Sequence, residues 1–405
     1  MIHIVGAGFS GLSLAWELQK AGLKVIVYEK NRIGGRIQSY RTPTHLRETA
    51  ANGVLWNPRF EVLAKELGVE FQPSQNEAKK RFIFHNQRPR RWPLSFLETI
   101  KFLAAGFKFV LKKIFTKKQI DSDLTLEQWG TQSFGAPFTG VILSAAVQGI
   151  FALTPKYLNA KAVLESFKPV TAFKKAKKYK PVTYSPKDGM GELISALKQK
   201  LAEKDVIIKY QEILDLKDLN LEKNDVVVIA TSAWEAAQLI PQAQRLDQIQ
   251  AVPITTVTLV WPKGARTLEG FGCLFPPVER FFAAGVLINS CIFANRGPNP
   301  SETWIISQDL EKLSDEQIKQ HVLMDRQRLF PNQDEPLESH IVRWPKAIPA
   351  YNLQLEKFLE TYQQTAKTLA KENIYLSGNY LGKIGLAKIY DQNIVLAKKL
   401  KVHYG

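Results

Sequence analysis

Short apolar runs alternate with amphipathic stretches along this chain, a pattern typical of α/β proteins whose parallel strands are buried between helices. The first run, residues 2–5 (IHIV), leads through a glycine-rich turn into LSLAWELQKAG, which predicts an amphipathic helix ending at Gly22. A second run, KVIVYE, ends at Glu29. Further apolar runs predict two short strands within 205–216, a buried strand within 224–234 and a strand that ends at Ser377-Gly378.

These strands come from three separate parts of the chain. We therefore predict an α/β fold with one discontinuous Rossmann-like domain made of residues 1–70, 186–250 and 370–405. Two inserts separate these three parts. We expect residues 71–185 to form a helical segment and residues 251–369 to form an α+β substrate domain. A chain of 405 residues is long enough for two such domains.

The stretch RRWPLSFLETIKFLAAGFKFVLKKIFTKK, residues 90–118, predicts an amphipathic helix in the first insert. Its longest uncharged run, FLAAGF, has six residues, whereas a membrane span needs about 20, so we expect it not to cross a bilayer. Two interpretations remain. The apolar face packs onto its own domain, or it lies on an anionic membrane surface. On a helical wheel the apolar stripe contains Leu97, Ile100, Ala104, Phe107, Leu111 and Ile114, and Lys112, Lys113, Lys117 and Lys118 follow at its end.

The amino-terminal turn has the spacing of a dinucleotide-binding fingerprint, Gly6-x-Gly8-x-x-Gly11, between a strand and a helix. Gly6 permits the tight turn, Gly8 lets the backbone approach a pyrophosphate, and Gly11 allows the helix to pack on the strand. Glu29, 18 positions after Gly11, is placed to bind a ribose. The positions expected to contact the nucleotide here are Gly6, Gly8, Phe9, Ser10, Gly11, Glu29 and Lys30.

The net charge of the chain indicates which kinds of partner it favours. The formal net charge is +17, from 55 Lys and Arg against 38 Asp and Glu, which favours anionic partners. We expect no nucleic acid, because the basic runs at 79–81, 88–91 and 174–180 lack a recognition fold or interleaved aromatic residues. Two cysteines and six histidines without ligand spacing predict no metal site. A strand from residue 2 predicts no signal peptide and a cytoplasmic protein, peripheral on the membrane if residues 90–118 lie there.

The segment Arg32-Ile-Gly34-Gly35-Arg36 follows the second strand. This sequence resembles that of flavoproteins with two dinucleotide-binding domains, of the amine oxidase type. The resemblance implies FAD as cofactor and a short helix–strand pair at the C-terminus that faces the flavin. The further cofactor positions it implies are Gly34, Gly35, Arg36, Ala50, Ala51, Asn52, Gly53, Ile213, Gly378, Ile384, Gly385 and Leu386.

Both inserts are similar to the oxygen-dependent protoporphyrinogen oxidase family in AVQGIFALTPKYLNAKAV, GFGCLFP, GVLINSCIFANRGP and RWPKAIPAYN, which occur in the family's order. The resemblance implies that Arg81 pairs with a substrate propionate. It also implies that Ala146 and Gly149 line the substrate cavity and that Leu274 contacts the ring face. Asn52, the catalytic candidate, would orient or polarise a pyrrole. Alternatively, Arg81 is a surface residue, Leu274 a core residue and Asn52 a turn residue.

The implied activity is oxidation of protoporphyrinogen IX by O2, in which the flavin carries the redox chemistry and the protein orients the substrate. We assign no general base from the sequence. Coproporphyrinogen III is the nearest alternative substrate, and another amine oxidase or desaturase is the alternative enzyme. A third possibility is a flavoprotein-like fold that binds a hydrophobic partner without catalysis. The sequence does not indicate an oligomeric state.

Overall fold

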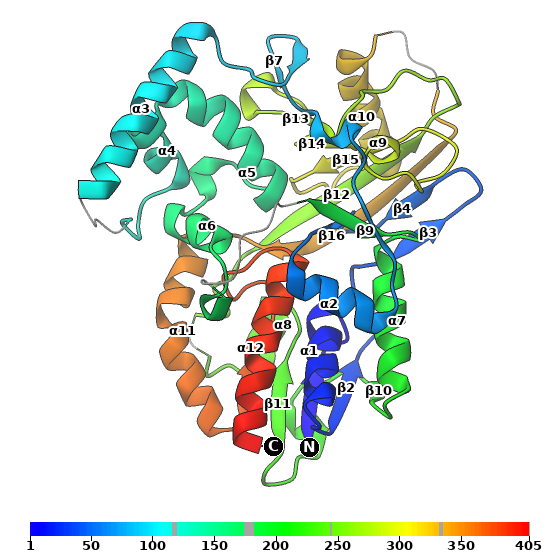
Figure 1. Cartoon of the computed structure of the whole chain (residues 1–405), viewed down its shortest axis with the longest axis vertical. Coiled ribbons are helices and arrows are strands. Elements are labelled where there is room, and N and C mark those ends of the chain that lie inside the picture. The colour runs from blue at the N-terminus through cyan, green and yellow to red at the C-terminus, as the bar shows by residue number, and fades with distance from the viewer. Residues whose placement is uncertain (116–119, 174–181, 244, 332–334, 405) are drawn as a thin grey trace.

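A computed structural model describes residues 1–115, 120–173, 182–243, 245–331 and 335–404, with side chains described outside 108–115. Most of the nucleotide-binding half forms the lower part of Figure 1 and most of the two inserts forms the upper part, but residues 353–369 of the second insert belong to a helix in the lower part. The two termini lie close together at the lower end. The lysine run at 174–180, together with Lys117 and Lys118, lies outside the described residues.

The lower half is built on a parallel sheet of five strands in the order β10-β2-β1-β11-β17. The predicted α/β class and Rossmann-like sheet are thus confirmed. The inner strands β1 and β11 are fully buried because helices cover both faces, whereas the edge strand β10 is mostly exposed. These strands are β1 (Ile2–Val5), β2 (Val25–Glu29), β10 (Ile207–Tyr210), β11 (Val226–Ile229) and β17 (Ile374–Leu376).

Alternate residues of these strands enter two separate hydrophobic cores. Ile4, Val27 and Val228 face one core, with α1 (Phe9–Lys20), α2 (Pro58–Leu67), α7 (Met190–Ala202) and α12 (Leu386–Tyr404). Val5 and Ile229 face the other core, with α8 (Ala233–Leu239) and α11 (Leu353–Lys371). The alternation follows from the two-residue period of a strand.

One predicted strand was wrong. Of the two short strands expected within 205–216, only β10 forms, and Leu216–Leu219 is a 3₁₀ turn capped by the Asp215 side chain. Ile213 packs into the second core while Leu214 is exposed, so this part of the apolar run anchors a loop. The remaining 3₁₀ turns are Glu77–Lys79, Pro155–Tyr157, Thr171–Phe173 and Pro277–Glu279.

The upper half contains a mixed sheet of seven strands in the order β16-β12-β15-β14-β13-β7-β8. Helix α10 (Asp315–Leu329) packs against the core beside it. Strands β7 and β8 come from the first insert, and β7 pairs in parallel with β13 of the second. The strands are β7 (Arg81–His85), β8 (Arg88–Arg90), β12 (Ala251–Val260), β13 (Gly272–Leu274), β14 (Gly285–Ile288), β15 (Ser301–Ile306) and β16 (Glu338–Pro349), and the short helix α9 is Asn289–Ile292.

Two small antiparallel sheets connect the halves. A hairpin of β3 (Ser39–Arg41) and β4 (Leu46–Glu48) follows the nucleotide-binding turn. Strands β5 (Val54–Leu55), β6 (Phe71–Pro73) and β9 (Thr183–Pro186) form the other sheet. The buried Arg296 guanidinium donates to Glu48, to Ser185 and to the Asn52 carbonyl, so one side chain joins both small sheets to the second insert.

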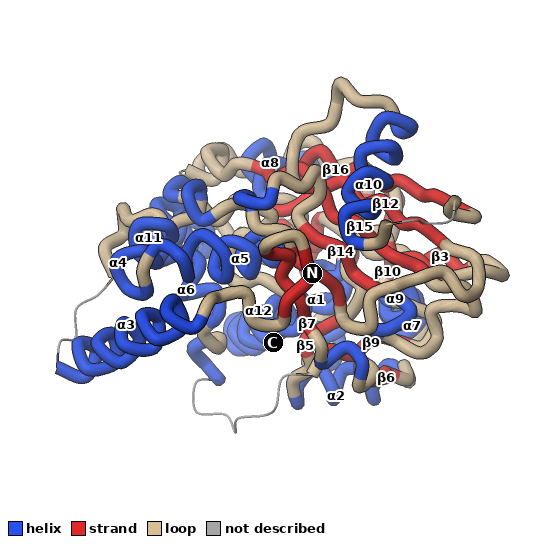
Figure 2. Tube along the Cα trace, turned by 90° about the horizontal axis from the view of Figure 1, so that it is seen from above, coloured by secondary structure: helices blue, strands red, loops and turns tan. Residues whose placement is uncertain are grey.

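The first insert is mainly helical, with α3 (Phe96–Phe115), α4 (Leu126–Phe134), a π-helical turn (Phe138–Leu143), α5 (Ser144–Phe151) and α6 (Ala160–Phe167). Phe102 attaches α3 to this group, with its ring centroid 4.5 Å from that of Phe138. Helix α3 lies at the outer edge of the molecule (Figures 1 and 2). Among the residues that the structure describes, no helix combines the length and the hydrophobicity that crossing a bilayer requires.

Candidate functional site

A cleft of about 800 Å³ opens at the carboxyl ends of β1, β2 and β11. This is where open α/β sheets bind their ligands. Eleven of the residues predicted to contact the cofactor line it: Gly6, Gly8, Phe9, Ser10, Glu29, Lys30, Gly34, Gly35, Arg36, Ile213 and Gly378. Segments from all three parts of the Rossmann-like half therefore meet at one elongated site.

The glycines of the first turn have three different surroundings. Gly6 has φ +106°, a conformation that favours glycine, and a Cβ there would lie 3.0 Å from the Ala230 carbonyl oxygen. A Cβ on Gly11 would lie 1.9 Å from the Gly6 carbonyl oxygen, so helix α1 can pack this closely only without a side chain. Gly8, by contrast, faces open space, since its Cβ would meet nothing within 4 Å. Gly8 is therefore the glycine at which a ligand can approach the backbone.

Gly8 is also the N-cap of α1 and has no side chain with which to cap the helix. The amide groups of the first turn and the helix dipole therefore face the cleft, an arrangement that binds phosphate. The second glycine pair, Gly34 and Gly35, has φ values of +91° and +55°. Gly34 forms a bridge with Gly8, so the two glycine turns border the same part of the cleft.

Glu29 is held by the backbone around it. One carboxylate oxygen accepts from the Ala7 amide at 2.9 Å, and the other accepts from the amides of Asn31 (3.0 Å) and Arg32 (3.1 Å). These bonds fix the carboxylate at the end of β2, within the cleft. A carboxylate so placed accepts hydrogen bonds from ribose hydroxyl groups. Next to it, the Lys30 ammonium is paired with Glu235 at 2.8 Å.

A buried network fixes the start of α1 against the end of β17. The Ser10 and Ser377 hydroxyl groups are 2.7 Å apart, and Ser377 donates to the Asn393 amide oxygen at 2.6 Å. The Asn393 amide nitrogen donates to the Ser10 carbonyl (2.8 Å) and to the Ser13 hydroxyl (2.9 Å). Asn393, on α12, thereby holds the start of α1 and the end of β17 together beside the cleft.

The far end of the cleft is aromatic and cationic. The Arg36 guanidinium lies 5.8 Å from the Trp234 ring centroid and 6.0 Å from that of Trp344, and it donates to the Lys346 carbonyl at 2.6 Å. Burial lowers the pKa of Arg36, and the Glu235 carboxylate opposes that shift. The Trp344 indole nitrogen donates to the Thr49 carbonyl at 2.8 Å, which places the segment after Thr49 beside this end.

Several predicted cofactor residues lie next to the cleft without lining it. Gly53 packs closely on β9, where a Cβ would lie 2.8 Å from the Tyr184 carbonyl oxygen. The Asn52 carbonyl accepts from Arg296 at 2.9 Å, which is a structural contact. The helix expected near Ile384 begins at Leu386, and Ile389, one turn later, reaches the cleft. This group comprises Gly11, Ala50, Ala51, Asn52, Gly53, Ile384, Gly385 and Leu386.

The predicted substrate residues are brought together at a different place, where α5 packs on β13. A Cβ on Gly149 would lie 2.7 Å from Leu274 Cδ2, so the Leu274 side chain fills the space at Gly149. Ala146 precedes Gly149 by one helical turn on α5. Arg81 pairs in register with Gly272, two residues before Leu274, and its exposed guanidinium lies 4.4 Å from the Phe271 ring centroid.

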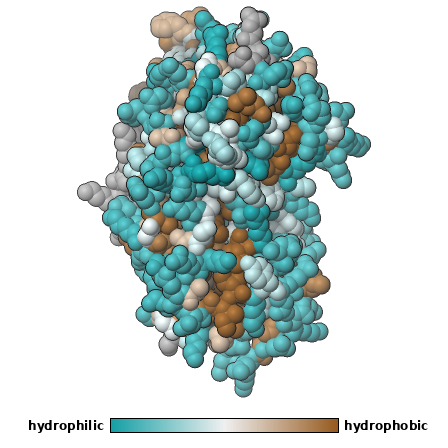
Figure 3. All heavy atoms as spheres, turned by 90° about the vertical axis from the view of Figure 1, so that its right-hand side faces the viewer, coloured by the Kyte–Doolittle hydropathy of each residue, from teal (hydrophilic) through white to brown (hydrophobic). Residues whose placement is uncertain are grey.

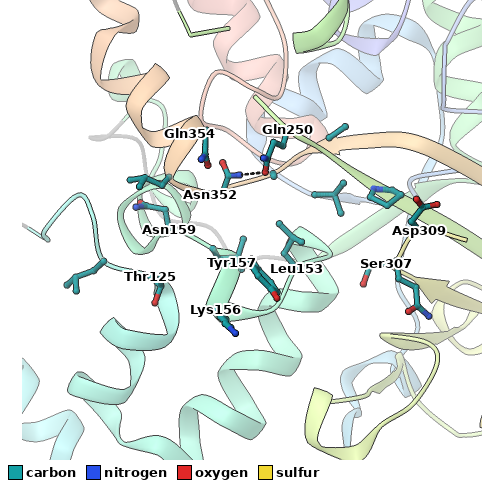
Figure 4. Close-up of a pocket in the computed structure, with 18 of the residues that line it drawn as sticks. Thr125, Leu153, Lys156, Tyr157, Asn159, Gln250, Ser307, Asp309, Asn352 and Gln354 are labelled. Atoms are coloured by element: carbon teal, nitrogen blue, oxygen red, sulfur yellow. Dashed lines mark hydrogen bonds between the residues drawn. The ribbon is translucent and has the colours of Figure 1, made fainter. Parts of the chain in front are cut away.

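A second cavity of about 510 Å³ lies where the helical insert meets the ends of β12 and β16 (Figure 4). Leu153, Lys156 and Tyr157 approach it from the connection between α5 and α6, and Asn352 donates to Gln250 at 2.8 Å across it. Of the described residues that line this cavity, none is among those that the sequence indicated as site residues.

Sequence reasoning missed part of the cleft lining. Trp344 lies in RWPKAIPAYN and Ser232 in NDVVVIATSAW, two segments whose motifs were recognised without any role for these residues. Glu235 also lines the cleft and accepts from the Ser232 hydroxyl and backbone in a capping box. The Ser-x-x-Glu spacing is a signal that could have located the start of α8 beside the nucleotide.

Comparison with known proteins gives one family. The profile described as flavin containing amine oxidoreductase matches residues 9–384. Among curated proteins, protoporphyrinogen oxidase 2 (chloroplastic/mitochondrial) of Arabidopsis thaliana is 24% identical, with 96% of this chain and 91% of that protein covered. Protoporphyrinogen oxidase of Homo sapiens is 22% identical, with 74% of this chain and 75% of that protein covered.

Solved structures share the whole fold. A candidate protoporphyrinogen oxidase from Exiguobacterium sp. 255-15 superposes with a TM-score of 0.80 at 17% identity, covering 99% of this chain and 98% of the other. Reduced UDP-galactopyranose mutase superposes with a TM-score of 0.76 at 15% identity, covering 100% and 96%. Because proteins named for different substrates share this architecture, the fold alone does not select a substrate.

Proposed function

The chain belongs to the flavin containing amine oxidoreductases, and from that membership we propose that it is an FAD-dependent oxidase of a porphyrinogen, with protoporphyrinogen IX as substrate and O2 as electron acceptor. The observation that carries the proposal is the match to a protoporphyrinogen oxidase across 96% of this chain and 91% of that relative. The match includes both inserts, where substrate residues of a two-domain flavoprotein lie, and not only the nucleotide-binding half.

The residues that line the cleft fit FAD. Gly8 leaves open space at the start of α1 for the pyrophosphate, and the Glu29 carboxylate is fixed where it can accept from the ribose hydroxyl groups. Gly378 and Trp344 line the opposite part of the same cleft and would hold the rest of the dinucleotide. FAD bound there would supply the electron-accepting group for dehydrogenation.

The protein itself orients the substrate and excludes water. Arg81, whose guanidinium is exposed beside Phe271, is suited to bind a propionate through two parallel hydrogen bonds. Leu274 and Gly149 touch each other between the sheet and α5, and rotation of the Leu274 side chain opens apolar space at the glycine. We therefore assign substrate binding to Arg81, Ala146, Gly149 and Leu274, and positioning of a pyrrole to Asn52.

Helix α3 supports a membrane-surface partner. Phe96, Leu97, Ile100, Leu103 and Phe107 expose between 47% and 78% of their surface, so the described part of the apolar stripe is accessible to a membrane surface. Leu111 and Ile114 of that stripe lie outside the residues whose side chains the structure describes. Trp92, 47% exposed, precedes the helix. The face on the right of Figure 1, away from α3, is mostly hydrophilic with separate apolar patches (Figure 3). We propose that α3 lies on the surface of an anionic membrane.

The activity is tested by supplying protoporphyrinogen IX or coproporphyrinogen III under air to the FAD-containing protein. Porphyrin fluorescence and H2O2 are then measured together. We expect both products with protoporphyrinogen IX and a lower kcat/KM with coproporphyrinogen III. A higher kcat/KM with coproporphyrinogen III identifies that compound as the substrate, and no oxidation of either porphyrinogen by flavin-loaded protein refutes the proposal.

The membrane contact is tested by flotation with vesicles that contain anionic lipid. Wild-type protein is expected to float, less so at high salt because the Debye length shortens to about 3 Å at 1 M. Ile100→Glu should abolish flotation, since it places a charge in the apolar stripe. Val402→Glu, a change at another exposed apolar position (80%) on α12, serves as the matched control and should float like the wild type. Equal flotation of both variants contradicts the assignment.

A further inference from the structure

A cluster of two histidines and a glutamate lies outside the cleft, between the β3–β4 hairpin and the start of β16. Each of His45, Glu338 and His340 offers one ligand atom, and these three atoms all lie within 4.8 Å of one another. The sequence predicts no metal site here, because His45 and Glu338 are 293 positions apart in the chain. Only the folded chain brings them together.

The distances suit a transition metal ion. One Glu338 carboxylate oxygen lies 3.1 Å from His340 Nε2 and 3.8 Å from His45 Nδ1. In a tetrahedral zinc site with bonds of about 2.0–2.2 Å, neighbouring ligand atoms are about 3.4 Å apart. The two observed distances lie on either side of that value, and all three ligand atoms lie within 4.8 Å of one another, so the side chains must draw together around an ion.

The chemistry of the residues agrees with the geometry. The His45 side chain is fully buried. Its Nδ1 atom, the nitrogen that faces Glu338, also lies 3.1 Å from the Thr44 hydroxyl. The Thr44 hydroxyl donates to Glu338 and holds the carboxylate in place, as outer-shell partners do in metal sites.

Other contacts place the three side chains firmly. The His45 and His340 rings are stacked with centroids 5.1 Å apart. The Thr42 hydroxyl lies 3.0 Å from His45 Nδ1. Glu338 and His340 are two residues apart on β16 and therefore on the same face of the strand. Arg47, the nearest cation, has its guanidinium 4.7 Å from the Tyr40 ring centroid, where the ring face offsets part of its charge.

From these observations we propose that His45, Glu338 and His340 bind a single Zn²⁺ ion, with a fourth position open to water. The ion has a structural role. It fastens the β3–β4 hairpin of the nucleotide-binding half to β16, the strand that carries Trp344 at the far end of the cleft. This proposal concerns a site separate from the cofactor cleft and does not depend on which substrate the enzyme oxidises.

The test uses the untagged, FAD-containing full chain, freed of metal with a chelator and dialysed against Zn²⁺. We expect one Zn²⁺ per chain by elemental analysis, and an unfolding temperature that rises with Zn²⁺ concentration as mass action requires. His340→Gln and Glu338→Gln, both partly exposed positions, should each weaken Zn²⁺ binding at least tenfold by calorimetric titration. His403→Gln, which removes an exposed histidine at the C-terminal end of α12, is the control and should bind like the wild type.

The Zn²⁺ affinities of these variants can support or overturn the proposed site. Stoichiometric binding that both cluster variants weaken and the control preserves supports the site. Wild-type protein that retains no Zn²⁺, or that binds it with the same affinity as His340→Gln and Glu338→Gln, overturns it. If one cluster variant fails to fold, the Zn²⁺ affinity of the other variant still tests the site. Zn²⁺ affinity is measured without a porphyrinogen, so the result does not depend on the outcome of the activity assay.

Discussion

The different surroundings of Gly8 and Gly11 allow a sharp test of the cofactor site. A Cβ on Gly8 meets nothing within 4 Å, and its φ of −72° and ψ of 179° suit alanine. Gly8→Ala should therefore change the free energy of unfolding without cofactor by no more than about 0.5 kcal/mol, since alanine is a poorer N-cap than glycine by about 1 kcal/mol and the stiffer unfolded chain offsets about 0.4–1 kcal/mol of that cost. The methyl group instead enters the space assigned to the pyrophosphate.

Gly11→Ala, three residues later, should do the reverse. Its Cβ would lie 1.9 Å from the Gly6 carbonyl oxygen, so the helix must move away from the strand. Overpacking of this kind costs about 1–3 kcal/mol, against a gain of about 1 kcal/mol from replacing glycine in a helix. Because the 1.9 Å contact is with a backbone atom, which cannot rotate away, the cost lies in the upper part of that range, about 2–3 kcal/mol, and we expect a net destabilisation of about 1–2 kcal/mol before any effect on the cofactor.

Two measurements separate the variants. Urea unfolding without FAD reports the stability of the fold, and titration of flavin fluorescence reports FAD affinity. Gly8→Ala should unfold at the wild-type urea concentration and bind FAD about 10- to 100-fold more weakly, equivalent to about 1.4–2.8 kcal/mol. Wild-type affinity in Gly8→Ala, or wild-type stability in Gly11→Ala, would refute the reasoning from these contacts.

Three further predictions follow from single contacts. Arg326→Met should lower the free energy of unfolding, measured in urea, by about 3–5 kcal/mol, because it leaves the fully buried Glu302 carboxylate without its cationic partner at 2.9 Å. Adding Glu302→Gln to this variant should restore part of the lost stability. A double variant no more stable than Arg326→Met would contradict the pairing. Burial lowers the pKa of Lys388 from 10.5 to about 8, so between these values the unfolded chain binds more protons and stability rises with pH. The free energy of unfolding of wild type and of Lys388→Met is measured between pH about 8 and about 10. The rise that Lys388 causes in wild type should be absent in Lys388→Met. Arg81→Ala should raise KM for a porphyrinogen more than it lowers kcat, since the proposed contact is made in the bound ground state, and an unchanged KM removes Arg81 from the site.

The parts of the fold that depend on local pattern could be predicted from the sequence. The apolar runs at residues 2–5 and 226–229 are strands because helices bury both faces, and the spacing of Gly6, Gly8 and Gly11 identifies the turn after the first of them. The strand expected after Tyr210 does not form, because Ile213 fills its place in the core from a loop. The hydrophobic pattern alone does not distinguish a short strand from a loop that buries one apolar side chain.

Contacts between distant segments escaped prediction. The position of Trp344 at the cleft depends on a bond to Thr49, and the histidine–glutamate cluster depends on the register of β16 against β12. The apolar stripe of α3 could be read from the sequence, but which side it faces depends on Phe102, whose aromatic contacts turn the other residues outwards. Such information resides in tertiary packing and is absent from any local window.

The position of β17 has a consequence for how the enzyme matures. This strand pairs with β11, and the residues that fasten it to the start of α1, Ser377 and Asn393, come near the end of the chain. On the ribosome, the glycine turn emerges long before Ser377 and Asn393, which hold β17 in place beside it. A nascent chain can therefore form its first strands early, yet the contacts that fasten β17 to the start of α1 can form only after residue 393 has been synthesised.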